Sequence, residues 1–160
     1  MKKILSIMAV VTVALLMSAC SGSEKNNDEG EYLDLGLPSG TLWKCHYEEG
    51  GLYTYEEAML KWGKNIPSKS QIEELLLSCK WDWTGEGMLA TGPNGAILYL
   101  PAAGMWYYDG INSFEGQFGS FWSATSKNDT EAYYLVFYST QIEMPSFDKN
   151  NYGASVLLVK

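Results

Sequence analysis

The sequence predicts one α+β domain in which two helices pack on short, mostly antiparallel sheets connected by long irregular loops. Three observations lead to this prediction. The two segments with helix-start signals both lie before residue 80, and segments with the pattern of strands lie on either side of them. The 16 glycines and the 14% of aromatic residues are typical of a loop-rich domain that holds large rigid side chains. No internal repeat and no second linker divides the chain after residue 31.

The first expected element of the domain is a hairpin. Residues 32–37 and 41–45 each alternate between apolar and other side chains, as half-buried strands do. Between them, Pro38-Ser39-Gly40 has the composition of a turn. We therefore expect two short antiparallel strands at the start of the domain.

The first helix is expected to begin at Thr54. The threonine hydroxyl can cap the helix, and Glu57 follows three residues later, which completes the sequence pattern of a capping box. The helical pattern continues for about ten residues. Gly63 is expected to end it, because glycine is the usual residue just past a helix.

The second helix is expected to follow Pro67, with Ser68 or Ser70 as its cap. Its apolar residues recur every three or four positions and therefore share one face. Glu73 and Glu74 fall in its first turns, where the helix dipole favours acidic side chains. We interpret these two carboxylates as structural rather than as a catalytic pair.

Short strands are expected in the rest of the chain. Residues 88–91 and 96–100 flank Gly92-Pro93-Asn94-Gly95, a turn sequence with two residues that tolerate a left-handed backbone. A glycine-rich aromatic loop then extends to Gly119. The later segments expected to be strands or short apolar stretches are 120–125, 132–138 and 154–159.

Residues 1–19 have the pattern of a secretory signal peptide. A pair of lysines precedes an apolar run over residues 4–17, and small residues follow just before Cys20. The run of about 14 residues is shorter than the roughly 20 that a membrane-spanning helix needs. We therefore predict a cleaved signal rather than a membrane span.

The sequence at the end of this segment, Leu-Met-Ser-Ala-Cys, resembles the lipobox of bacterial lipoproteins. The resemblance implies that Cys20 becomes the mature N-terminus and carries the lipid that anchors the protein to a membrane. The alternative is an ordinary cleaved signal followed by an incidental cysteine. No Asp follows Cys20, which implies sorting to the outer membrane, and the nearby acidic residues resemble the surface-export signals of Bacteroidota lipoproteins.

The small, polar and acidic composition of residues 20–31 predicts a flexible tether between the lipid anchor and the folded domain, which covers residues 32–160. The whole chain has 11 Lys, no Arg and 19 acidic residues, for a net charge of −8. Nucleic acid is therefore excluded as a partner, because phosphate binding needs clustered basic side chains. Attraction to anionic lipids is weak for the same reason, so membrane association depends on the anchor.

Two cysteines remain after Cys20. An exported chain can join Cys45 and Cys79 in a disulfide that closes a loop of about 34 residues and adds roughly 3–4 kcal/mol of stability. Both lie in apolar surroundings, so buried thiols are an equal alternative. We expect no metal site and no cofactor, because two cysteines and His46 do not provide four ligands at zinc spacing.

Several motifs occur in an order that matches a known family. They are 34–43 (DLGLPSGTLW), 66–75 (IPSKSQIEEL), 91–95 (TGPNG), 98–104 (LYLPAAG), 119–125 (GSFWSAT) and 153–157 (GASVL). Together they resemble the Fibrobacter succinogenes major paralogous domain, a C-type-lectin-like family common in Bacteroidota lipoproteins. The resemblance implies a C-type-lectin-like fold in which Trp43 and Trp122 are buried. Leu157 departs from the family, which commonly has an arginine there.

The resemblance also indicates where a ligand would bind. In this fold ligands meet the irregular loops between the late strands, and these loops vary on a rigid scaffold. In this sequence they are rich in the Tyr, Trp, Asn, Ser and Gly that antibody loops favour. The candidate ligand-binding residues are Trp106, Tyr107, Tyr108, Asp109, Asn112, Asp148, Asn151 and Tyr152.

The leading functional hypothesis is a cell-envelope lipoprotein whose non-catalytic module binds a protein or glycan ligand. Two alternatives are a structural or adhesin-type surface component and a receptor diversified by a retroelement, a class that shares this fold. An enzyme is the least favoured hypothesis, because no acid–base pair, no nucleophile with a base and no metal cluster stands out.

Overall fold

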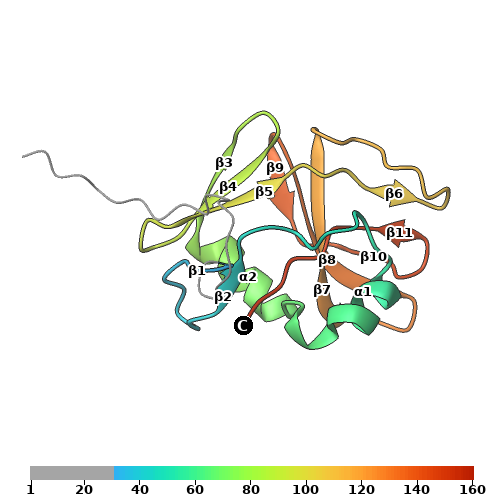
Figure 1. Cartoon of the computed structure of the whole chain (residues 1–160), viewed down its shortest axis with the longest axis horizontal. Coiled ribbons are helices and arrows are strands. Elements are labelled where there is room, and N and C mark those ends of the chain that lie inside the picture. The colour runs from blue at the N-terminus through green and yellow to red at the C-terminus, as the bar shows by residue number, and fades with distance from the viewer. Residues whose placement is uncertain (1–30) are drawn as a thin grey trace, which may run out of the picture.

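The computed structural model describes residues 31–160, which form a mixed α+β domain as predicted (Figure 1). The expected signal peptide and Cys20 lie outside the described residues, as does all of the tether except Glu31. Helices α1 (Tyr55–Trp62) and α2 (Lys69–Ser78) lie along the lower side of the view, with a short 3₁₀ helix, η2 (Gly63–Asn65), between them. Neither α-helix is long and apolar enough to span a bilayer. The strands are β1 (Tyr32–Asp34), β2 (Leu42–Lys44), β3 (Lys80–Trp83), β4 (Gly87–Thr91), β5 (Ile97–Pro101), β6 (Trp106–Tyr107), β7 (Phe118–Ser126), β8 (Glu131–Tyr138), β9 (Gln141–Glu143), β10 (Ser146–Asp148) and β11 (Tyr152–Gly153).

These strands form small sheets whose ladders are all antiparallel. β1 pairs with β2, and β3, β4 and β5 form a three-stranded sheet. The largest sheet consists of β7, β8, β9 and β10. A separate pair, β6 and β11, joins the long aromatic loop to a segment near the end of the chain. The predicted loop is thus connected to the body of the domain by main-chain hydrogen bonds.

The first hairpin forms as predicted, and a nearly buried lysine connects it to the flanking chain. In β2, the Lys44 Nζ lies 2.5 Å from a carboxylate oxygen of Glu31 and 2.5 Å from one of Glu48. The hydrogen bond from Lys44 holds the pKa of Glu31 below its usual value. A buried ammonium is stable only when it is paired, so the two carboxylates allow Lys44 to sit in this position.

Both helices begin where their caps predict. Thr54 caps α1 and Glu57 completes the capping box. Ser68, rather than Ser70, caps α2, and here Gln71 supplies the returning side chain. Glu74 accepts a hydrogen bond of 2.9 Å from the backbone of the first hairpin, which gives this carboxylate a structural role.

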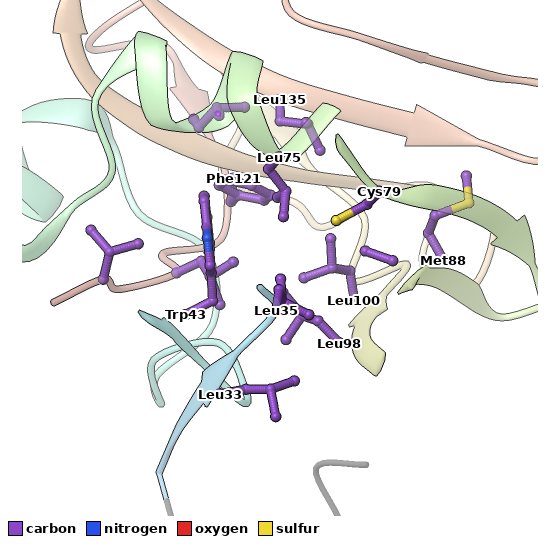
Figure 2. Packing of buried hydrophobic residues seen from close by; sticks show 14 of the residues in the cluster. Leu33, Leu35, Trp43, Leu75, Cys79, Met88, Leu98, Leu100, Phe121 and Leu135 are labelled. Carbon is purple, nitrogen blue, oxygen red and sulfur yellow. The ribbon is translucent and has the colours of Figure 1, made fainter. Parts of the chain in front are cut away.

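The hydrophobic core consists of two clusters that lie on opposite faces of the β7–β8 pair. Successive residues of a strand point to opposite faces, and accordingly Phe121 belongs to the first cluster and Trp122 to the second. The first cluster packs the hairpin, α2 and the β3–β4–β5 sheet together, with Trp43 and Leu75 near its centre (Figure 2). The second packs α1 and β11 against the same strands. Trp43 and Trp122 are both fully buried, as expected.

The strand expected over residues 154–159 does not form as a continuous strand, so that prediction is wrong. All six of these residues are buried, and their backbone groups bond to several different elements. Ala154 bridges to Tyr53, Ser155 to Phe121 and Val159 to Trp43. Because each residue has a different neighbour, the segment crosses between the two clusters instead of extending one ladder.

Of the two alternatives left open for Cys45 and Cys79, the structure excludes a disulfide between them, because the thiol of Cys79 is free. Cys79 follows α2, packs in the first cluster and carries a free, buried thiol (Figure 2). Burial disfavours the thiolate and raises the pKa of Cys79 to about 11. Cys79 is therefore an inert core residue at neutral pH.

Candidate functional site

The aromatic loop between β5 and β7 is an ordered structure. The backbones of Met105 and Ser113 exchange two hydrogen bonds, of 3.0 and 2.7 Å, which close the loop at its base. Gly104 makes this closure possible: its φ is +80°, and a Cβ there would lie 2.2 Å from the side-chain oxygen of Asn112. The loop therefore presents its side chains from a fixed backbone.

Trp106 forms one wall of the site. Its indole Nε1 donates a hydrogen bond of 3.4 Å to the carbonyl of Leu52. Its ring packs directly on Gly153 of the neighbouring strand β11, where a Cβ would come within 2.0 Å of the indole nitrogen. Only glycine at position 153 leaves room for the tryptophan, so Trp106 has a single well-defined position.

Next to Trp106, four large apolar side chains of the loop face solvent. We call them the exposed loop surface: Tyr107, Tyr108, Ile111 and Phe114, which are 41%, 64%, 64% and 56% exposed. The rings of Tyr107 and Tyr108 meet edge-on with their centres 4.1 Å apart. Tyr107 also contacts Phe147 of β10, at 5.4 Å, which connects the loop to the largest sheet.

Two of these residues have a strained backbone. Tyr108 (φ 56°) and Phe114 (φ 63°) are the two non-glycine residues among 31–160 with a positive φ. Bulky side chains rarely adopt this conformation, which costs about 1–3 kcal/mol per residue. In folded proteins such strain persists where the surroundings impose it and is concentrated at functional sites. Both strained positions carry an exposed aromatic ring, which marks this surface as the candidate site.

The predicted polar residues stabilise the loop and its neighbouring turn. The Asp109 carboxylate accepts a hydrogen bond from the backbone of Ile111 (3.0 Å), and the Asn112 amide donates to the carbonyl of Ala103 (3.1 Å). Asp148 accepts hydrogen bonds from the backbones of the two asparagines that follow it, and these bonds lower its pKa. The hydrogen bonds of these side chains are made to nearby backbone groups, so the side chains stabilise the local structure.

Asn151 contributes through its backbone as well as its side chain. Its carbonyl accepts a hydrogen bond of 2.9 Å from the backbone of Tyr108, and its amide donates to Asp148 at 3.2 Å. It therefore fixes the position of the loop from the neighbouring turn. Five of the eight predicted site residues thus lie in one loop, and Asp148 and Asn151 support that loop from β10 and the turn after it.

Tyr152 is a correction to the predicted site. Its side chain is only 1% exposed and lies in the second core cluster, with its ring centre 5.6 Å from that of Trp122 and 5.1 Å from that of Tyr134. Its hydroxyl lies 3.4 Å from that of Ser120, and burial raises its pKa. A ligand that approaches from solvent does not reach this ring.

A cavity of about 460 Å³ lies beside the loop. Trp106 and Asn112, two of the candidate ligand-binding residues, line one side. The other side is formed by Tyr47, Glu48, Gly51 and Leu52, which the sequence analysis did not single out. This segment has neither helical nor strand periodicity, so no signal in the sequence indicated that it faces the aromatic loop.

Among residues 31–160, no three His, Cys, Asp or Glu side chains lie in positions that could hold a metal ion. His46 is exposed, and its Nδ1 lies 3.1 Å from the carbonyl of Tyr47. What the site offers is a rigid aromatic surface next to a cavity.

The fold and the candidate site together define the class of this chain: a mixed α+β domain with an exposed aromatic loop. This class is defined by the architecture. Comparisons of this chain with family models, with curated proteins and with solved structures found no match.

Proposed function

We propose that this chain is a cell-envelope lipoprotein whose C-type-lectin-like domain binds a protein or glycan ligand without catalysing a reaction. The exposed loop surface favours a protein as the ligand. The domain is of the Fibrobacter succinogenes major paralogous type, and the lipid on Cys20 anchors it in the outer membrane.

One observation carries this proposal: strained backbone and exposed aromatic rings coincide in the same loop. Each feature destabilises the free protein, because the strain costs free energy and apolar rings contact water. A binding surface accounts for both, since rigid aromatic side chains are the commonest sources of binding energy in protein interfaces.

The chemistry of the surface favours a protein over a glycan. Ile111 and Phe114 present apolar side chains with no hydroxyl, which suit the apolar centre of a protein interface. A glycan would instead engage the adjacent cavity, where Asn112 and the two carboxylates of Glu48 and Glu115 offer polar groups.

The arrangement of elements supports the family assignment. A first hairpin, two helices and then small sheets with a long loop follow each other in the order that the resemblance implies. The two tryptophans expected to be fold markers are buried, one in each core cluster. Leu157 is buried in the first cluster, so an apolar side chain fits the position where the family commonly has an arginine.

The test is a binding screen with the domain as it stands in the full chain. Arrays of purified extracellular proteins and of glycans are probed with the wild-type protein and with the double variant Tyr108→Ser, Ile111→Ser. We expect the wild type to bind a protein and the variant to bind it at least ten times more weakly, which corresponds to about 1.4 kcal/mol or more. Leu60→Ser on α1, where the leucine is also exposed, is the matched control and should leave binding unchanged.

Three results would contradict the proposal. Equal binding by the wild type and the loop variant would show that the loop is not the contact surface. Binding only to further copies of this chain would favour the structural or adhesin-type alternative. Loop sequences that vary between copies of the gene, beside a reverse transcriptase, would instead identify a diversified receptor.

A further inference from the structure

Strand β3 presents two tryptophans on one face. Trp81 and Trp83 are two residues apart, so both indoles point to the same side of the strand, and Lys80 and Asp82 point to the other. Opposite them in the neighbouring strand β4 lie Ala90 and Met88, which are buried. The indoles therefore continue the buried face of the β3–β4–β5 sheet outward to its edge.

Because β3 is an edge strand, the core covers the two indoles only in part. Both are half-buried, whereas their neighbours on β4 and β5 are enclosed. Next to them lies the hairpin of β8 and β9, whose turn contains Ser139 and Thr140. Figure 1 shows β9 close to the β3–β4–β5 sheet, at a distance from β6 and β11.

The sheet edge and the hairpin border an open pocket of about 190 Å³, which we call the tryptophan groove. It is lined by Trp81, Trp83, Met88, Ser139, Thr140, Gln141 and Ile142. At about 30 Å³ per water molecule, this volume equals roughly six waters, which is room for one six-membered ring with its substituents. None of the lining side chains carries a charge.

The polar atoms of the groove differ in whether they have a hydrogen-bond partner among the described residues. The Trp81 Nε1 donates a hydrogen bond of 3.3 Å to the carbonyl of Leu76, which holds this indole in place. The Trp83 Nε1 and the hydroxyls of Ser139 and Thr140 form no hydrogen bond with any of the residues 31–160. One ring is thus fixed, while one donor and two hydroxyls are free to bond a guest.

We propose that the tryptophan groove binds one neutral sugar ring, as part of a neutral glycan. The apolar C–H face of a pyranose packs on an indole, and its hydroxyls exchange hydrogen bonds with Ser139, Thr140 and the Trp83 Nε1. An apolar guest fits less well, because it would remove water from these three groups without replacing the hydrogen bonds. A charged sugar would find no counter-ion in the lining.

This site is independent of the exposed loop surface. The loop is joined to β6 and β11 at one end of the view in Figure 1, whereas the β3–β4 hairpin lies at the other end. A glycan bound in the groove and a protein bound at the loop would therefore occupy separate surfaces.

Titration of the full chain with neutral oligosaccharides, followed by tryptophan fluorescence, tests the proposal. The probes are gluco-, galacto- and manno-oligosaccharides, with a glucuronic acid oligomer as the charged comparison. We expect saturable binding of at least one neutral probe, weakened at least tenfold by Trp83→Ala and partly restored by Trp83→Phe. Thr140→Val removes a hydroxyl from an exposed turn at similar volume, so it should weaken binding several-fold without affecting folding.

Two variants serve as controls. Asp82→Ala changes the opposite face of the same strand and should bind the sugar as the wild type does. Tyr108→Ser should also bind normally, which separates this site from the loop. The proposal is wrong if no neutral probe binds saturably, if Thr140→Val binds the sugar as tightly as wild type, or if only apolar peptides occupy the groove.

Discussion

Phe114 combines a strained backbone with an exposed ring in a single residue. Its φ of 63° suits asparagine or glycine, yet the position holds an aromatic ring that is mostly exposed. The ring makes no aromatic contact with any described residue. The Phe114 carbonyl accepts hydrogen bonds of 2.9 Å from the backbones of Gln117 and Phe118, which hold the strained conformation. The exposed ring itself would gain burial from a partner that covers it.

The substitution Phe114→Asn should raise the stability of the domain. Asparagine tolerates a left-handed backbone, so we expect an increase of about 0.5–1.5 kcal/mol in the free energy of unfolding. Denaturant unfolding measures this difference. In Ile111→Asn the same side chain enters the same loop at a position without positive φ, and no gain is expected there. A gain in both variants would mean that removing exposed apolar surface, not strain, is responsible.

Residue types alone misplaced one side chain, that of Tyr152, and left the state of another, Cys79, undecided. Tyr152 stands between Asn151 and Gly153, a sequence typical of a loop, yet pairing of β11 with β6 turns its ring into the core. Cys79 has the apolar neighbours of a buried thiol and of a buried disulfide alike. Both outcomes depend on which distant segments meet, and that information is absent from the neighbouring residues.

At the level of elements, the most accurate predictions rest on local interactions. Both helix starts follow from a cap and a returning side chain three residues later, and both capping boxes form. Hairpins with a turn signal, β1–β2 and β4–β5, are also found where expected. Strands β3, β9 and β10 carry no such signal and exist because a neighbouring strand offers them hydrogen bonds.

The cap of α2 can be tested by removing a hydroxyl. In Ser68→Ala the backbone N–H of Gln71 loses its acceptor, whereas the Gln71 side chain can still accept from the backbone N–H of residue 68. We therefore expect a loss of about 1 kcal/mol in unfolding free energy. Ser78→Ala, at the other end of the same helix, removes a hydroxyl that makes no hydrogen bond with the described residues and should cost nothing. Equal losses in the two variants would disprove the capping role.

The candidate site was predictable only in part, because its other side is formed by a segment that is distant in sequence from the aromatic loop. The composition of the aromatic loop indicates a surface loop, because Tyr, Trp and Asn between glycines are unusual in a hydrophobic core. The segment that faces it across the cavity, residues 47–52, has no such composition. The tryptophan groove likewise depends on a contact between β3 and the β8–β9 turn, which are more than fifty residues apart.

At the scale of the whole molecule, charge decides how the protein can be held at a membrane. The net charge of −8 opposes attraction to anionic lipids, and no described helix spans a bilayer. Under the proposed function, retention therefore depends on the acyl chains attached at Cys20. Several acyl chains together give stable anchoring, which a single chain does not.

Replacement of the anchoring residue tests this part of the proposal. In cells that express Cys20→Ala, we expect the protein to move from the membrane fraction to the soluble fraction, as measured by immunoblotting after ultracentrifugation. Cys79→Ala is the matched control, since it removes a buried thiol elsewhere and should leave the distribution unchanged. A Cys20→Ala protein that stays in the membrane fraction would rule out the lipid anchor.

The path of residues 154–159 also has a consequence for the time course of folding. These residues contact Tyr53, Phe121 and Trp43, so they complete both core clusters, and each contact joins parts of the chain that are distant in sequence. Domains dominated by such long-range contacts fold slowly, because the chain must close large loops before it gains stabilising interactions. Until this segment is in place, both core clusters are incomplete. The domain is therefore expected to fold in one late step, in which this stretch docks, rather than element by element.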